Sequence, residues 1–227
     1  MRILSVGKEI SHQALTIESA TFANLQEILE SYTYDYIIIH GGDGTIRRVL
    51  KQLHTLQNRP KFILNPTGSF NVVAKLHRAP DIHTVLDMLA SGQTPKTQEH
   101  RFFTLNDEIF LFSAGNMGDL QHIFLSETLR FGWLKHGMLK YILAVIFLLP
   151  VHLVMTPFML ASRTRFFIFT PLHSIKKLGS FYGEVPKELI MDLENDYNML
   201  ELDGDIVTIH SRKLHISQAG SIEIVTQ

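Results

Sequence analysis

Cysteine is absent from this chain of 227 residues. Without thiols the protein has no disulfide, no thiolate metal site and no cysteine nucleophile. An excess of charge of one sign is also missing, because 21 basic and 22 acidic side chains give a formal net charge of −1. Global electrostatic attraction to nucleic acid is therefore not expected, and we predict no nucleic-acid partner. With 45% hydrophobic and 19% charged residues, the chain can bury a substantial core.

Charge is missing locally from residues 141–161, "YILAVIFLLPVHLVMTPFMLA". This length reaches the threshold for a membrane span, but Pro150 and Pro157 divide it. We expect a buried helix over 138–149 and a strand at "VHLVM", which is richer in β-branched residues. A membrane-docked surface and a true span are the alternatives. The apolar run at the N-terminus is too short for a signal peptide, so we expect a cytoplasmic protein with peripheral contact at the inner face of the membrane.

The first half of the chain alternates between strand and helix patterns. The segment that follows Gly44 is expected to be a helix with one apolar face, formed by Ile46, Val49, Leu50 and Leu53. We expect Arg47, Arg48 and Lys51 to point outward. Strands are expected at "MRILSVG", "YDYIIIH" and "KFILNP", and helices at "TFANLQEILESY", "TGSFNVVAKL" and "DIHTVLDMLASG". This order predicts a three-layer α/β domain with mainly parallel strands.

The second half is β-rich. "HRFFTLNDEIFLFSAGN" predicts a hairpin about Asn106 and Asp107. Further strands are expected at "RTRFFIFT", "NMLELDGDIV", "KLHISQ" and "SIEIVTQ", and a helix at "LQHIFLSETLRF". We therefore predict an α/β domain over residues 1–97 and a β-rich, sandwich-like domain over residues 98–227. We leave open that the last strands of the chain return to the first domain.

Two glycine turns follow neighbouring strands of the α/β half. The first, "GGDGT", contains Gly41, Gly42, Asp43, Gly44 and Thr45, and the second, "NPTGSFN", contains Gly68, Ser69 and Asn71. Turns at the carboxyl ends of parallel strands lie where open α/β sheets bind ligands, and glycines let backbone N–H groups approach a phosphate. A carboxylate among them suits phosphoryl transfer with Mg²⁺. The alternative is a glycine turn in which Asp43 or Thr45 caps a helix.

The pair of motifs "GGDGT" and "PTGSFNVVA" resembles the superfamily of diacylglycerol kinases, bacterial lipid kinases and sphingosine kinases, whose pattern is GGDGT followed by P-x-G-[TS]-x-N-x-x-A. NAD kinases and phosphofructokinases share a turn of the first type but not the second motif. "FLFSAGNMGDL", "KHGMLKY", "NMLELDGDI" and the closing "SIEIVTQ" resemble further family segments in the same order.

The resemblance implies an ATP-dependent lipid kinase that uses Mg²⁺ and phosphorylates a diacylglycerol-type hydroxyl. It implies that the residues of the two glycine turns, Gly41, Gly42, Asp43, Gly44, Thr45, Gly68, Ser69 and Asn71, bind nucleotide. Asp43 would hold the metal and phosphates or act as a base, and Asp203 would be the general base; the alternative for Asp203 is an Asp-Gly turn between strands. A lipid substrate and membrane contact are the implied partners, and a homodimer is left open.

Other functions stay open because the chain departs from the family pattern. The first ten residues lack an Asn-Pro-x-Ser-Gly turn, the aspartate expected after Asn71 is Val72, and the glutamate expected after Asp203 and Gly204 is Asp205. A non-catalytic lipid- or nucleotide-binding relative and, less favoured, an NAD kinase-like enzyme are the alternatives. Zinc is not expected from the 12 scattered histidines, and His40 is interpreted as a strand-end residue.

Overall fold

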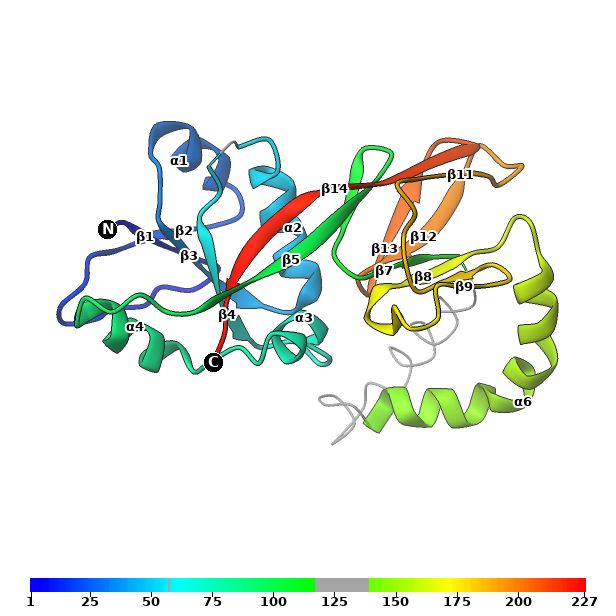
Figure 1. The fold of residues 1–227 in the computed structure, drawn as a ribbon, viewed down its shortest axis with the longest axis horizontal. Coiled ribbons are helices and arrows are strands. Elements are labelled where there is room, and N and C mark those ends of the chain that lie inside the picture. The colour runs from blue at the N-terminus through cyan, green and yellow to red at the C-terminus, as the bar shows by residue number, and fades with distance from the viewer. Residues whose placement is uncertain (57, 117–138) are drawn as a thin grey trace. The chain divides into compact units, whose positions relative to one another are not determined.

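The computed structural model describes residues 1–56, 58–116 and 139–227 (Figure 1). The helix expected at 120–131, most of "KHGMLKY" and the end of "FLFSAGNMGDL" lie outside these ranges. The chain forms two compact units, one of Met1–Phe102 with Gly220–Gln227, and one of Phe103–Ala219. The units divide within two strands, β5 (Thr97–Leu105) and β14 (Lys213–Val225).

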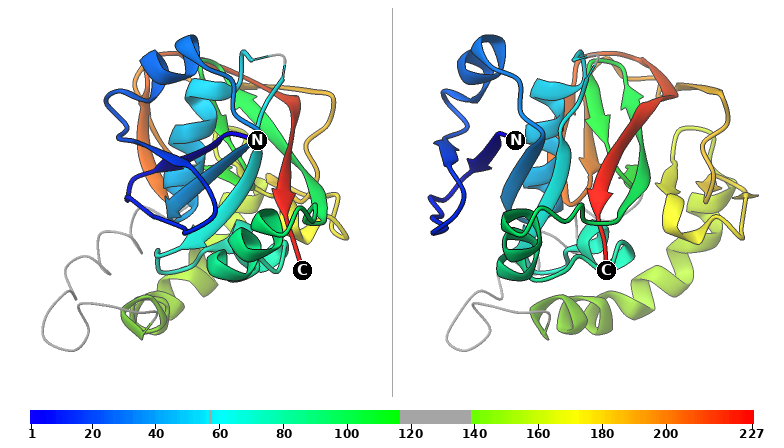
Figure 2. Two further views of the ribbon diagram at one scale, coloured as in Figure 1. Left: turned by 90° about the vertical axis from the view of Figure 1, so that its left-hand side faces the viewer. Right: turned by 60° about the vertical axis from the view of Figure 1, so that its left-hand side comes forward.

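The first unit contains a parallel sheet in the order β2-β1-β3-β4, with the end of β14 parallel to β4 at Ile224 and Phe62. Figure 2 shows this sheet from two further sides. Its strands are β1 (Ile3–Val6), β2 (Ile17–Ala20), β3 (Tyr36–Gly41) and β4 (Lys61–Pro66). Its helices are α1 (Leu25–Ser31), α2 (Asp43–Leu53), α3 (Val72–Leu76) and α4 (Ile82–Ala90). The α/β prediction is confirmed.

The core of the first unit forms because its strands are apolar on both faces and helices pack against them. Ile38 and Ile63 pack in one cluster with the apolar side of α4, while α2 packs on β3 through its own buried face. Each expected apolar residue of α2 is buried, namely Ile46, Val49, Leu50 and Leu53. The expectation that Arg47 points outward is wrong: it is 6% exposed, whereas Arg48 is exposed. Strand β2 was not expected, because "IESA" is short and half polar.

The second unit is β-rich, as expected. One sheet has the order β13-β12-β7-β8-β10-β9. In addition, β5 pairs with β6 and β14 pairs with β11, and both pairs are antiparallel. The strands are β6 (Glu108–Phe110), β7 (Ser113–Gly115), β8 (Phe167–Phe169), β9 (Lys177–Leu178), β10 (Phe181–Tyr182), β11 (Glu188–Asp192), β12 (Asn198–Leu202) and β13 (Asp205–Ile209), with a 3₁₀ turn at Thr170–Leu172. The segments "KLHISQ" and "SIEIVTQ" were expected as two strands, but they form the single strand β14.

Helix α6 (Leu139–Ala161) runs through both prolines of the apolar stretch. The strand expected at "VHLVM" is therefore wrong. A proline removes one N–H donor and bends a helix without ending it when the residues on both sides favour helix, and α6 changes direction along its length in Figure 1. Burial was also expected for this region, yet side chains such as Leu153 and Phe158 are each 70% exposed. Within the described ranges, no helix has the length and apolarity needed to cross a membrane.

Candidate functional site

The first glycine turn joins the carboxyl end of β3 to the N-terminus of α2. Gly41 ends β3 and pairs with Pro66 at the end of β4, so the two turns start side by side at one sheet edge. Gly42 is the N-cap of α2, and its carbonyl accepts the first helical hydrogen bonds from Thr45 and Ile46. A Cβ at Gly41 would lie 2.3 Å from Oγ1 of Thr45, so the turn is closed by direct packing that only glycine permits here.

The two glycine turns are in direct contact. A Cβ at Gly42 would lie 3.2 Å from the Cα of Gly68, and a Cβ at Gly68 would lie 2.8 Å from the Cα of Gly42. The expected residues from both motifs are thus brought together. Residues 66–70 are exposed and Gly41, Gly42, Gly44 and Thr45 are half-buried, so part of this backbone faces solvent.

Asn71 shapes the second turn. It has φ 49° and ψ 54°, a left-handed conformation that asparagine tolerates better than most residues. Its side chain closes the turn on Gly68, accepting from the Gly68 N–H at 3.0 Å and donating to the Gly68 carbonyl at 2.6 Å. Asn71 therefore holds the turn in shape from within.

Asp43 ties one turn to the other. Its carboxylate oxygens accept hydrogen bonds from the N–H groups of Val72 at 2.8 Å and Val73 at 3.0 Å, which are the first residues of α3. The side chain is 7% exposed, and burial raises the pKa of Asp43 while these two hydrogen bonds oppose the rise. The alternative of a helix cap is thus realised, but Asp43 caps α3, not its own helix α2.

His40 links three strand ends beside the first turn. Asn65 Nδ2 donates to His40 Nδ1 at 2.8 Å, which leaves His40 Nε2 to donate to Ser5 Oγ at 3.0 Å. Ser5 Oγ donates in turn to the carbonyl of Lys8 at 2.6 Å. Burial, and then the positive charge of Lys8, lowers the pKa of His40. Ser5 and Asn65 were missed in the sequence, where only their positions at strand ends could have indicated them.

Asp203 lies in the second unit, in the two-residue turn between β12 and β13. Leu202 pairs with Asp205, and both turn residues have positive φ, 52° for Asp203 and 88° for Gly204. The Asp-Gly hairpin turn is therefore present. The Asp203 side chain is 4% exposed.

Three backbone N–H groups hold the carboxylate of Asp203. It accepts hydrogen bonds from the N–H groups of Leu111 at 2.7 Å, Phe112 at 2.9 Å and Ser113 at 3.1 Å. The neighbouring Glu201, also buried, accepts from Ser113 Oγ at 3.0 Å and from the Gly204 N–H. Glu201 was not singled out in the sequence, because it looks like an outward residue of an ordinary strand.

A metal at the glycine turns would depend on few protein ligands. Within the described ranges, no group of three or more His, Asp and Glu side chains could hold a metal ion. Two hydrogen bonds leave the Asp43 carboxylate with further acceptor directions. This fits Mg²⁺, which typically uses one or two carboxylates together with substrate phosphates and water.

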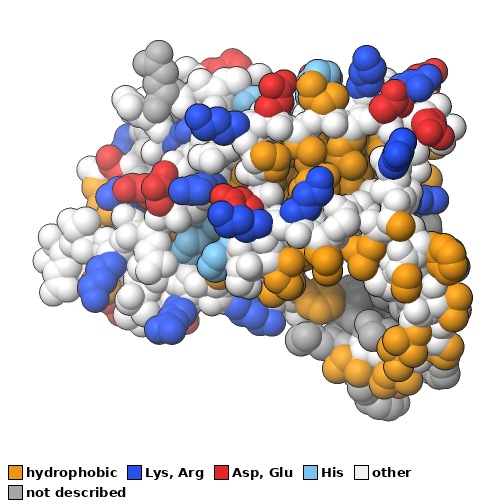
Figure 3. All heavy atoms as spheres, turned by 45° about the vertical axis from the view of Figure 1, so that its right-hand side comes forward, with side chains coloured by type: hydrophobic (Ala, Val, Ile, Leu, Met, Phe, Trp, Pro, Cys, Tyr) orange, Lys and Arg blue, Asp and Glu red, His pale blue; other side chains and the backbone are white. Residues whose placement is uncertain are grey.

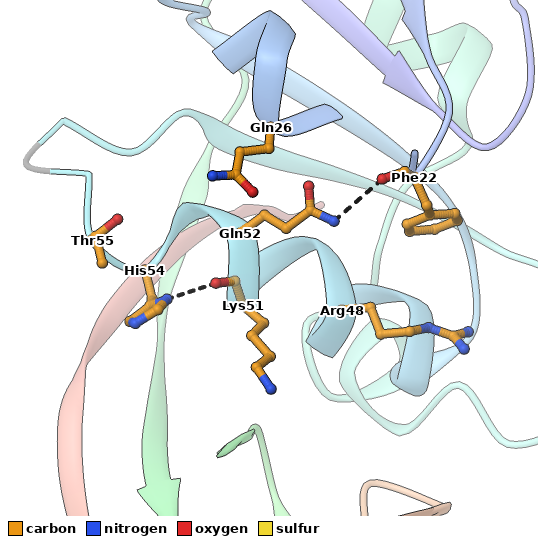
Figure 4. Close-up of a pocket in the computed structure, with 7 residues that line it drawn as sticks. All are labelled: Phe22, Gln26, Arg48, Lys51, Gln52, His54 and Thr55. Atoms are coloured by element: carbon orange, nitrogen blue, oxygen red, sulfur yellow. Dashed lines mark hydrogen bonds between the residues drawn. The ribbon is translucent and has the colours of Figure 1, made fainter. Parts of the chain in front are cut away.

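A separate groove lies beside α1 and α2 of the first unit (Figure 4). Its volume is about 750 Å³, and it contains no residue of either glycine turn. The guanidinium of Arg48 lies 5.8 Å from the ring centre of Phe22, while Lys51 points away from Phe22 in Figure 4. Gln52 donates a long, 3.5 Å hydrogen bond to the Phe22 carbonyl. This groove does not enclose the predicted site.

Fold and site together define an α/β unit in which two touching glycine turns occupy the carboxyl edge of a parallel sheet. Residues 5–100 match the model of the diacylglycerol kinase catalytic domain. A diacylglycerol kinase of Staphylococcus epidermidis is 36% identical over 98 residues, which are 42% of this chain and 30% of that protein. A diacylglycerol kinase of Staphylococcus aureus is 38% identical over 64 residues, which are 28% of this chain and 20% of that protein.

The fold extends the likeness beyond the aligned sequence. A crystal structure of a diacylglycerol kinase from Bacillus anthracis superposes over 100% of this chain and 96% of that chain, with a TM-score of 0.56 and 14% identity. At this identity the superposition establishes the fold alone. Residues 5–100 are therefore similar to the diacylglycerol kinase catalytic domain, in agreement with the resemblance of the two glycine motifs. Its sequence matches cover about a third or less of the length of these relatives.

Proposed function

We propose that this protein transfers the γ-phosphoryl group of ATP to the hydroxyl of a diacylglycerol-type lipid. The observation that carries the proposal is the direct contact of the two glycine turns at neighbouring strand ends. The contact leaves no room for side chains between Gly42 and Gly68. Two backbone segments that meet in this way can bind the phosphates of one nucleotide from two sides.

The phosphates would lie against the exposed second turn and the N-terminus of α2. α2 has eleven residues, and the first N–H groups of a helix lack partners within it. These groups and the helix dipole favour negative charge. Gly41, Gly42, Gly44 and Thr45 would provide the first side of the cradle, and Gly68 and Ser69 the second.

Asp43 would act on the phosphates mainly through position and metal. Its hydrogen bonds to Val72 and Val73 fix the spacing of the turns. Its remaining acceptor directions would hold Mg²⁺, which neutralises phosphate charge when bound. Asn71 would keep the second turn in its binding shape.

In the transfer step the lipid hydroxyl oxygen bonds to the γ-phosphorus as the bond from that phosphorus to the β,γ-bridging oxygen breaks, and ADP leaves. The hydroxyl proton passes to a base, for which we propose Asp203. As a base, Asp203 would need an acceptor direction beyond those given to the three backbone N–H groups. These three hydrogen bonds favour the alternative role of Asp203, that of a residue bracing its own turn. A non-catalytic lipid- or nucleotide-binding relative is the second candidate function.

The test is transfer of label from γ-labelled ATP with Mg²⁺. We expect label in a chloroform-extractable product from diacylglycerol, no label in NADP when NAD is offered, and no transfer without a divalent cation. Label in NADP would replace the proposal with a soluble-acceptor kinase. ATP binding without transfer to any lipid offered would establish the non-catalytic relative.

A further inference from the structure

Helix α6 presents apolar side chains that the rest of the described chain leaves exposed. Six of them are between 48% and 70% exposed: Ile142, Ile146, Leu149, Leu153, Val154 and Phe158. The spacing of Ile142, Ile146, Leu149 and Leu153 places them along one side of the helix. Figure 3 shows hydrophobic side chains gathered over this part of the molecule, in the lower right of the view.

The composition of α6 is unfavourable for a helix surrounded by water. Residues 141–161 contain no charged side chain. A helix that is apolar on all sides normally lies in a protein core or in lipid, and exposed apolar patches of this kind mark an interaction surface. Since no described helix can cross a membrane, a position at the membrane interface fits the exposed side chains.

Cations collect where α6 ends. A pocket of about 460 Å³ follows directly, lined by Arg163, Arg165, Lys177 and Arg212 together with Asp192 and Glu194. Asp192 is paired with Arg212 at 2.7 Å, so these two charges offset one another. Arg163 and Arg165 are exposed, which leaves the pocket positively charged on the side next to the helix.

The wall of the pocket contacts the last turn of α6 directly. The carbonyl of Leu160, in the last turn of α6, accepts from the Ser180 N–H at 3.0 Å and from the Ser180 hydroxyl at 3.1 Å. A Cβ at Gly179 would lie 2.2 Å from the same carbonyl, so the pocket wall passes against the helix end at a distance that only glycine allows. The cationic pocket therefore adjoins the end of the apolar helix.

We propose that α6 and this cationic pocket form a docking surface for an anionic lipid bilayer. The exposed apolar side chains of α6 enter the boundary between headgroups and acyl chains, and Arg163, Arg165 and Lys177 meet lipid phosphates. Charge complementarity selects this occupant, because an apolar helix with cations at its end matches acyl chains beneath a negative surface. The inference deepens the proposed function, since a kinase with a lipid substrate must reach that lipid at a membrane.

The experiment is co-sedimentation of the full chain, without ATP, with vesicles of phosphatidylcholine alone and of equimolar phosphatidylcholine and phosphatidylglycerol. We expect binding to the anionic vesicles that weakens as salt is added. Leu153→Gln with Phe158→Gln should lower this binding roughly tenfold or more, because two large apolar side chains no longer enter the bilayer. Leu76→Gln, at a leucine 52% exposed in the first unit, is the matched control and should bind like the wild type.

The cations are tested separately. Arg163→Gln with Arg165→Gln should lower binding to anionic vesicles roughly tenfold while leaving the weaker binding to phosphatidylcholine unchanged. Lys96→Gln with Arg101→Gln, two exposed cations of the first unit, is the control that should change neither.

Three results would overturn the docking surface. The first is that the folded chain sediments with neither kind of vesicle. The second is that the wild type and the α6 variant bind equally. The third is that light scattering shows a dimer of the wild type that the α6 variant does not form. The last would show that a second copy of the chain covers the helix. Because no nucleotide is present, failure of phosphoryl transfer leaves this test unaffected, and failure of docking leaves the transfer assay with detergent-dispersed lipid unaffected.

Discussion

Replacing Asp43 with asparagine tests whether its carboxylate braces the two glycine turns. The carboxylate accepts from the N–H groups of Val72 and Val73 at 2.8 and 3.0 Å, and it is 7% exposed. An asparagine has one acceptor oxygen, so its NH₂ group would face one of these N–H donors. Loss of a charge-assisted hydrogen bond and the unsatisfied buried donor together should cost about 2–4 kcal/mol.

The measurement is urea and thermal unfolding of the nucleotide-free protein. For a chain of this size, the loss corresponds to a fall in Tm of roughly 5–15 °C. Asp81→Asn is the matched control: Asp81 also accepts from two helix N–H groups, those of His83 and Thr84, but at an exposed N-cap where asparagine serves as well. It should change stability by less than about 0.5 kcal/mol. Equal stability of Asp43→Asn and the wild type would refute the bracing role.

A Cβ at Gly68 would lie 2.8 Å from a backbone atom of the first turn, so Gly68→Ala should separate the two turns. We expect calorimetry to show no ATP binding by this variant. The control, Gly92→Ala at an exposed helix end, should bind ATP normally. Asp203→Asn should lower kcat by roughly 10²–10⁴ with little change in ATP affinity. Asp107→Asn, in the two-residue turn between β5 and β6, is its control, and full activity of Asp203→Asn would remove Asp203 from the mechanism. Burial lowers the pKa of His77 below its usual 6.5, so the unfolded state binds more protons below that pH and stability should fall on acidification. His77→Gln should flatten this dependence in urea unfolding between about pH 7.5 and 5.5, and an unchanged slope would contradict the argument.

Local patterns in the sequence were sufficient for the α/β half. Strands such as β3 are continuous apolar runs, and α2 carries its apolar residues at helical spacing, so each element could be predicted from its own residues. The glycine turns were predictable for the same reason, because positions that must be glycine depend on the local path of the backbone. That both turns lie at one sheet edge followed from the parallel order of the strands.

The tertiary structure decided which groups these residues contact. The sequence indicated that Asp43 could cap a helix, but the N–H groups it accepts from belong to residues about thirty positions later. The three N–H donors to Asp203 lie about ninety positions earlier. Hydrogen bonds between distant segments leave no periodicity in the sequence, so a carboxylate that braces a turn looks the same there as one that awaits a proton.

Burial of single side chains was also decided by the fold. Arg47 was assigned to the outer face of α2 from its charge and spacing, yet neighbouring elements cover it. The apolar residues of α6 were assigned to a core, yet several are exposed. Composition determined that α6 needs an apolar environment, because transferring such side chains from water is favourable wherever that environment is found. Only the packing of the other elements determined that the described part of the chain does not supply all of this apolar environment.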